Sequence, residues 1–298
     1  MVAILPSNFF AKKIVKELRK KNEDVILITT SLRDFRFKKK IKSHNVIHFI
    51  GSPTVTIIGI LALTRFKVWH KKIIVSWIGF DVRRVKHNIF WRLTTKIFKN
   101  LIDVNITEDE EAVNNLRKAN VIAEIKQPPI YSIYNIHDLP KEKKIAVYLP
   151  DKLKKDFDLY QGNLIKKLIE EFPHVDFIIT RNSGRYFSNR KNVECIKWAE
   201  NMEDIYKQVL AVIRLPIEDT TGVTIIETLS MGRTMIASAT TFPYCKIVKN
   251  YEDLKLHLKE VLQNPTLNTK GSEYVHKIYD NEKFTNELIT IYNNLSKS

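Results

Sequence analysis

The chain has 298 residues, of which 44% are hydrophobic and 28% charged. This is enough apolar material for two domains of roughly 150 residues, and it excludes disordered and collagen-like proteins. Two cysteines, Cys195 and Cys245, are too few for a disulfide scaffold, and the first residues carry too short an apolar run for a signal peptide, so we expect a protein of the reducing cytoplasm.

The positive charge of the chain is concentrated in its first third. Residues 1–100 hold 22 Lys and Arg against 5 Asp and Glu, whereas residues 101–298 hold 27 against 28. Such a field attracts anions, and phospholipid headgroups, nucleic acid and phosphorylated substrates all remain open as partners.

Short apolar runs alternate with amphipathic stretches along the first half, which predicts repeated β–α units on a parallel sheet. Strands are expected at 2–5, 25–29, 45–50, 72–78, 104–107 and 121–125, and helices at 9–21, 54–65, 87–101 and 108–119. The turn after strand 72–78 is expected at Gly79-Phe80-Asp81. Helix 54–65 belongs to the most apolar stretch, which is too short to span a bilayer, and we interpret it as a buried crossover helix with a basic, solvated end.

Gln127-Pro128-Pro129 and the aperiodic stretch 131–144 mark a joint between two domains, which we place at 1–135 and 136–298. The second domain repeats the pattern. Its strands are expected at 145–149, 175–180, 193–198, 210–215 and 234–238, and its helices at 163–172, 202–209, 222–231, 251–263 and 272–298. The last of these helices is a candidate to pack back on the first domain. The predicted class is α/β, with two Rossmann-like parallel-sheet domains.

The segment 214–238 is the most informative for chemistry. A strand ends in a polar loop, and a helix begins near Gly222, so the loop faces the crevice where open α/β sheets bind ligands. The backbone N–H groups of Gly222, Val223 and Thr224 would suit a pyrophosphate at the helix N-terminus. Glu227, in the first turns of that helix, could then reach the hydroxyls of an adjoining ribose.

This segment resembles the donor loop of retaining glycosyltransferases of the GT-B fold, in which two acidic residues are separated by seven. Here Asp219 and Glu227 have that spacing, and a Leu-Ser-Met-Gly-Arg-Thr-Met-Ile-Ala-Ser run follows. The run Trp-Ile-Gly-Phe-Asp-Val at 77–82 is similar to one found in some members of the family. The chain departs from the family in having Asp rather than Glu at 219 and Thr220-Thr221 in place of Gly-Phe.

The resemblance implies two Rossmann-like domains facing a central cleft, retention of anomeric configuration, no cofactor and no obligate metal. It makes Asp219 and Asp81 candidate catalytic residues and Lys152 and Arg181 candidate diphosphate cations. Structural alternatives remain open for each: helix capping for both aspartates and solvated surface charge for both cations. Glu227 could likewise be a surface helix residue.

The function that we expect is transfer of a sugar from a nucleotide diphosphate-sugar donor to an acceptor hydroxyl. The expected acceptor is a glycan, lipid-linked or at a membrane surface, because the basic half would hold a peripheral enzyme on the anionic inner face of a membrane. Two alternatives stay open: a nucleotide-sugar epimerase or phosphorylase on the same fold, and a non-enzymatic nucleic-acid-binding protein. We expect no nucleic acid partner, because the aromatic residues of the basic half mostly occupy apparent core positions.

Overall fold

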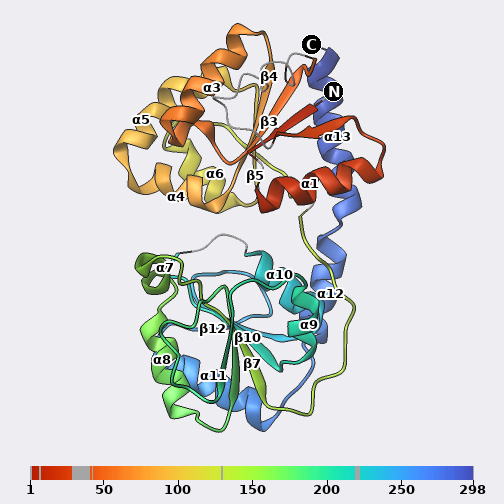
Figure 1. Ribbon diagram of the computed structural model, residues 1–298. Helices are drawn as coiled ribbons and strands as arrows, with labels where there is room; N and C mark the ends of the chain where they lie inside the picture. The colour runs from red at the N-terminus through yellow and green to blue at the C-terminus, as the bar shows by residue number, and fades with distance from the viewer. Residues whose placement is uncertain are drawn as a thin grey trace. The chain divides into compact units, whose positions relative to one another are not determined.

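The computed structural model describes residues 2–6, 8–28, 41, 43–128, 130–218 and 222–297, apart from the side chain of Phe80. The chain divides into two compact units, one of Met1–Ile130 with Asp280–Ser298 and the other of Tyr131–Tyr279. Each unit is built on a six-stranded parallel sheet with helices packed on it (Figure 1). The predicted α/β class with two Rossmann-like parallel sheets is thereby confirmed.

The first unit has its strands in the order β2-β1-β3-β4-β5-β6. These strands are β1 (Val2–Leu5), β2 (Val25–Leu27), β3 (Val46–Ile50), β4 (Lys72–Trp77), β5 (Val104–Thr107) and β6 (Glu124–Ile125). Its helices are α1 (Phe9–Lys20), α3 (Ile57–Val68), α4 (Gly79–His87), α5 (Ile89–Phe98), α6 (Glu110–Arg117) and α13 (Asn281–Lys297), with the short 3-10 helices η1 (Pro53–Val55) and η2 (Lys99–Leu101).

The central strands of this unit are buried on both faces, as continuous apolar runs in a parallel sheet require. α1 begins at Asn8, whose side chain accepts from the Ala11 N–H, and its buried face comprises Ala11, Ile14, Val15 and Leu18. In Figure 1 α13 lies beside α1, so the end of the chain completes the first unit.

Two expectations for this unit were wrong in part. α4 begins at Gly79, where a turn was expected, because Asp81 in its first turn and Arg84, Lys86 and His87 in its last complement the helix dipole. The predicted helix 54–65 is η1 followed by α3, and α3 is not a buried helix. Its residues Ile57 and Leu61 are 66% and 65% exposed.

The second unit has its strands in the order β12-β11-β10-β7-β8-β9. These strands are β7 (Lys144–Tyr148), β8 (Asp176–Thr180), β9 (Val193–Ile196), β10 (Ala211–Arg214), β11 (Thr234–Ala237) and β12 (Lys246–Ile247). Its helices are α7 (Lys154–Leu159), α8 (Gly162–Glu171), α9 (Met202–Lys207), α10 (Val223–Ser230), α11 (Tyr251–Gln263) and α12 (Thr269–Ile278). The expected helix 272–298 is therefore two helices, α12 and α13, which belong to different units.

A chain of hydrogen bonds fastens α13 to the first sheet. The Tyr292 hydroxyl lies 2.7 Å from Nδ1 of His48 on β3, and Nε2 of His48 lies 2.7 Å from the Ser76 hydroxyl on β4. Burial lowers the pKa of His48 to about 3, so the ring is neutral and can both donate and accept. No helix in the described part of the chain is long and apolar enough to cross a membrane.

Candidate active site

The candidate donor site lies in the second unit, where β10 ends and α10 begins. Gly222 is the N-cap of α10 and brings no side chain to its first turn, so the N–H groups at this end can serve a ligand. At the other end Gly232 has φ +73°, the left-handed conformation expected of a glycine just past a helix. The helix start at Gly222 and its glycine stop are confirmed.

Arg214, which the sequence analysis did not single out, is the cation in contact with this helix start. It ends β10, in register with Ala237 of β11, and only 7% of it is exposed. Its guanidinium carbon lies 5.3 Å from the ring centre of Tyr148 and 5.4 Å from that of Tyr160, and Nη2 is 3.4 Å from the Tyr160 hydroxyl. Both tyrosines thus hold the guanidinium at the carboxyl edge of the sheet.

Gly222 is needed for this close approach. A Cβ placed on Gly222 would lie 3.0 Å from both Cζ and Nη1 of Arg214. The positive end of the α10 dipole and a buried guanidinium therefore meet at one point, an arrangement that favours an anion. In the sequence, this anion site could have been indicated by an arginine at a strand end eight residues before a glycine at a helix start.

Glu227 is buried inside the unit, with 5% of it exposed. The Tyr206 hydroxyl on α9 donates to its Oε2 at 3.4 Å. Burial, and then the nearby Glu227 charge, hold the pKa values of Tyr206 and Tyr134 well above their usual range, so both phenols stay protonated. Glu227 is therefore an interior carboxylate with a tyrosine partner rather than a surface helix residue.

The other predicted donor-site residues fall into two groups. Asp219, the candidate catalytic residue of the loop that was expected to orient the sugar, lies outside the described residues. Lys152 and Arg181 follow the neighbouring strands β7 and β8, and the Asp151 N–H donates to the Arg181 carbonyl at 3.4 Å. Both side chains are exposed, and the Arg181 guanidinium stacks on Trp198, 4.4 Å from the ring centre. The structure thus joins their two loops at the carboxyl edge of the sheet.

Asp81 lies in the first unit, buried in the first turn of α4. Its Oδ2 accepts from the Ser52 N–H at 2.8 Å, and Gly51 adopts φ +98° where a Cβ would come within 3.0 Å of the same oxygen. Burial raises the pKa of Asp81 to about 6, against the opposing effects of the Ser52 bond and the Arg84 charge. The carboxyl ties the turn after β3 to α4, and its catalytic assignment stays a prediction.

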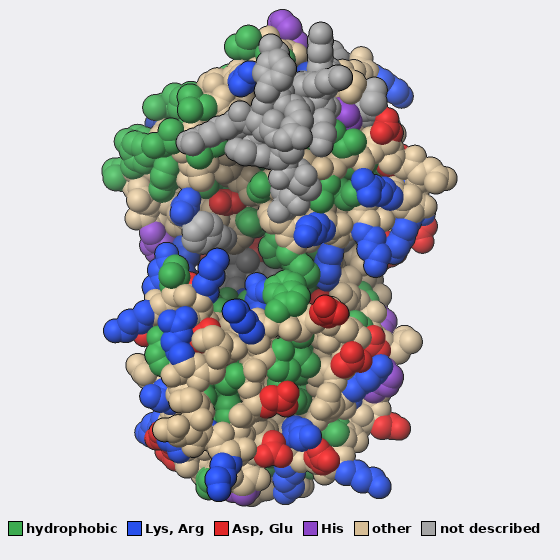
Figure 2. All heavy atoms as spheres, viewed as in Figure 1, with side chains coloured by type: hydrophobic (Ala, Val, Ile, Leu, Met, Phe, Trp, Pro, Cys, Tyr) green, Lys and Arg blue, Asp and Glu red, His purple; other side chains and the backbone are tan. Residues whose placement is uncertain are grey.

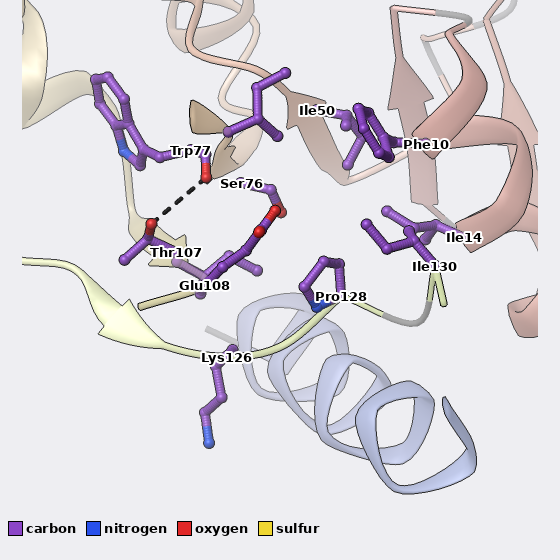
Figure 3. Close-up of a pocket in the computed structure, with 12 residues that line it drawn as sticks. Phe10, Ile14, Ile50, Ser76, Trp77, Thr107, Glu108, Lys126, Pro128 and Ile130 are labelled. Atoms are coloured by element: carbon purple, nitrogen blue, oxygen red, sulfur yellow. Dashed lines mark hydrogen bonds between the residues drawn. The ribbon is translucent and has the colours of Figure 1, made fainter. Parts of the chain in front are cut away.

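A small pocket, with room for only about 10 Å³ of water-sized molecule centres, lies at the carboxyl ends of β3, β4 and β5 in the same unit (Figure 3). Its lining is mostly apolar, and Phe10 and Ile14 of α1 point into it. Burial, and then the charge of Asp109, raise the pKa of Glu108 in this lining to about 8. The sequence pattern gave no sign of Glu108 as a site residue, because a carboxylate at a helix start is typical of a favourable contact with the helix dipole.

Sequence comparison finds no match to a family model or to a curated protein. Solved structures do match. The sucrose-phosphate synthase of Thermosynechococcus elongatus superposes with a TM-score of 0.76 at 12% identity, covering 99% of both chains. Alr3699/HepE of Anabaena, in complex with UDP-glucose, has a TM-score of 0.74 at 8% identity over 98% of this chain and 99% of its own. A putative UDP-N-acetylglucosamine 2-epimerase from Listeria monocytogenes has a TM-score of 0.61 at 11% identity over 100% and 96%.

These similarities extend over both units, since nearly the whole chain is covered in each case. At such identities they concern the fold, which is the one that the resemblance of segment 214–238 to the family's donor loop implied. The chain has the GT-B fold of nucleotide-sugar glycosyltransferases.

Proposed function

We propose that this protein is a glycosyltransferase that moves a sugar from a nucleotide diphosphate-sugar to an acceptor hydroxyl, with retention of anomeric configuration. The observation that carries the proposal is the contact between Arg214 and Gly222 at the start of α10. It combines a guanidinium, a helix N-terminus and a backbone that a diphosphate can approach closely. The GT-B fold supports the same assignment, because HepE was solved with UDP-glucose on this fold.

In this proposal different residues of the second unit bind different parts of the donor. The N–H groups of Gly222, Val223 and Thr224 bind the diphosphate with Arg214, and Lys152 and Arg181 add positive charge at the same sheet edge. Glu227 holds the ribose and Asp219 orients the sugar. The departing diphosphate is then stabilised by backbone dipoles and cations, so the reaction has no obligate need for a metal.

The chemical step exchanges one bond for another on the same carbon. The bond from the anomeric carbon to the diphosphate oxygen breaks, the acceptor oxygen bonds to that carbon from the same face, and the leaving phosphate oxygen takes the acceptor proton. The products are the glycosylated acceptor and a nucleoside diphosphate. The first unit would bind the acceptor, through its strand-end pocket and near Asp81, and its positive charge favours a glycan carried on lipid or at an anionic membrane surface.

A melting experiment with a panel of nucleoside diphosphates tests the donor assignment. A ligand at one hundred times its dissociation constant adds about 2.7 kcal/mol to the free energy of unfolding, enough to raise the melting temperature measurably. We expect one diphosphate of the panel, with uridine tested first, to stabilise the protein more than its monophosphate. Equal melting temperatures with every nucleotide would remove the proposed donor site.

Glu227→Ala should abolish donor turnover and leave the protein folded. Removing the carboxylate deprives the ribose of its proposed hydrogen-bond partner, while Tyr206 keeps its apolar packing. Product formation from a radiolabelled nucleotide-sugar measures the effect, and Glu273→Ala, at an exposed acidic position of α12, is the control. Full activity of Glu227→Ala would show that this carboxylate does not bind the donor.

A nucleotide-sugar epimerase is the second candidate, because one of the superposed structures is described as a UDP-N-acetylglucosamine 2-epimerase. An epimerase converts its nucleotide-sugar without any acceptor, whereas a transferase needs an acceptor hydroxyl other than water. Incubating the protein with a nucleotide-sugar alone and looking for an isomerised sugar separates the two.

A further inference from the structure

α5 buries a polar residue and exposes three large apolar ones, although its Trp91 and Phe98 pack against the core of the first unit. Thr95 is fully buried, with its hydroxyl 2.7 Å from that of Thr54, and the Thr94 hydroxyl donates to the Thr54 carbonyl at 2.9 Å. On the other side Ile89, Leu93 and Ile97 are 71%, 52% and 68% exposed, at the i, i+4 and i+8 spacing of one helix face. A helix of a water-exposed surface normally presents the opposite pattern.

α3, the helix that follows η1, is apolar nearly all round. One face, with Gly59, Ala62, Leu63 and Phe66, packs into the core, while Ile57 and Leu61 stand in solvent. Since a helix that is hydrophobic on all sides is ordinarily covered on all sides, this second face indicates a missing apolar neighbour.

The two helices present these residues on one part of the first unit. η1 leads directly into α3 and its Thr54 is bonded to both Thr94 and Thr95, so α5 lies against the start of α3. Figure 2 shows the resulting cluster of hydrophobic side chains at the upper left, over α3 and α5. We call it the α3/α5 face, defined by the exposed side chains of Ile57, Leu61, Ile89, Phe90, Leu93 and Ile97.

The segment that carries the α3/α5 face is strongly basic. Residues 51–100 contain ten Lys and Arg and one acidic residue, Asp81, which is buried. The exposed Arg65 and Lys96 stand on the same two helices as the apolar residues. A second copy of this chain covering the face would bring two positive surfaces together, whereas an anionic bilayer complements the charge and takes up the apolar side chains as well.

We propose that the α3/α5 face docks on an anionic lipid bilayer. Phe90 and the aliphatic side chains enter the boundary between headgroups and acyl chains, and the flanking cations remain among the lipid phosphates. This inference names the surface that would dock on the membrane carrying the acceptor, and in that respect it rests on the proposed function. Binding to vesicles, however, needs neither donor nor acceptor, so it is measured independently of turnover.

Flotation of the full-length protein with vesicles tests the proposal. Vesicles of phosphatidylcholine alone are compared with vesicles containing about one third phosphatidylglycerol, at physiological ionic strength. We expect stronger binding to the anionic vesicles, because the cations lose their counterpart in the neutral ones. Leu93→Ser with Ile97→Ser should weaken partitioning to anionic vesicles about tenfold or more, since two large side chains no longer leave water.

The matched control is Leu256→Ser with Ile122→Ser, which removes the same residue types at exposed positions outside the face and should float as the unmodified protein does. Lys96→Glu should weaken binding to anionic vesicles and change binding to neutral vesicles little. Three results would overturn the proposal: no flotation with either vesicle, unchanged flotation of the Leu93/Ile97 variant, or a dimer in solution that this variant turns into monomers. Failure of flotation with normal sugar transfer would reject the docking face and leave the proposed function standing.

Discussion

Burying a polar or charged side chain is unfavourable, and three buried residues of this protein are stabilised in different ways. His48 stays neutral between two hydroxyls, Asp81 accepts a backbone N–H and has a raised pKa, and Arg214 is flanked by two tyrosine rings. The first two fasten parts of the first unit together, since each bonds to a neighbouring element. Arg214 differs because it lies at a helix N-terminus, and the two positive charges together favour binding of an anion at that point.

The neutral His48 should make the protein sensitive to acid. Its pKa is about 3 in the folded state against 6.5 for an unperturbed histidine, so the unfolded chain takes up the proton first and stability falls as the pH drops below about 6.5. Between pH 6.5 and 4 this amounts to about 3 kcal/mol. His48→Gln should flatten this part of the profile, measured by urea unfolding at several pH values.

The raised pKa of Asp81 acts in the opposite direction, because there the folded protein keeps its proton longer and stability falls as the pH rises from about 3.8 to 6. The two effects partly offset in the unmodified protein, so each variant must be compared with it pH by pH. His174→Gln, at an exposed position, is the control for histidine removal. Parallel profiles for His48→Gln and the unmodified protein would contradict the assignment.

Arg214→Lys should weaken nucleoside diphosphate binding about tenfold or more. The ammonium keeps the charge but cannot lie flat against Tyr148 and Tyr160 or present two N–H groups to a phosphate. Titration calorimetry measures the dissociation constant, and far-UV circular dichroism checks the fold. Arg181→Lys, an exchange at an exposed arginine that also stacks on an aromatic ring, should have a smaller effect. If Arg181→Lys weakened diphosphate binding more than Arg214→Lys did, the diphosphate would be assigned to the loop after β8.

Among the elements, α13 shows how one helix at the end of the sequence completes a domain begun at the other end. Phe284, Leu288 and Tyr292 are buried against the first unit, and Tyr292 bonds to His48 on β3. The second unit, in contrast, is one continuous stretch, Tyr131–Tyr279, with its own core. The two units therefore differ in what each needs to fold alone.

A fragment of residues 131–279 should fold by itself and keep the diphosphate site, whereas a fragment of residues 1–130 should not. The fragment 1–130 lacks α13 and therefore exposes apolar surface that α13 covers in the full chain. This costs about 5 kcal/mol or more of the free energy of unfolding, a large part of a domain's stability. Joining 280–298 to residue 130 by a Gly/Ser linker should restore a cooperative melt. Circular dichroism against temperature follows each fragment. A cooperative melt of 1–130 without the linker and helix would show that α13 is dispensable.

At the scale of the whole molecule, charge and chemistry are divided between the units. The excess positive charge lies in the first third of the sequence, and therefore in the first unit, while the second unit holds the strand-end arginine and the glycine at the helix start. The proposed reaction uses this division, with the nucleotide-sugar on the nearly neutral unit and an acceptor at a membrane surface on the basic one.

The amino-acid sequence alone predicted the α/β class, the parallel sheets and the helix that begins at Gly222, because these depend on local hydrophobic period and on glycine at a helix end. It could not show the contact of Arg214 with Gly222, and it offered the last helix only as a candidate to pack on the first domain, because both depend on which elements become neighbours. Nor could it show that α3 and α5 turn apolar faces to solvent. The hydrophobic period reveals that a helix has an apolar side, and only tertiary packing decides whether the protein itself covers it.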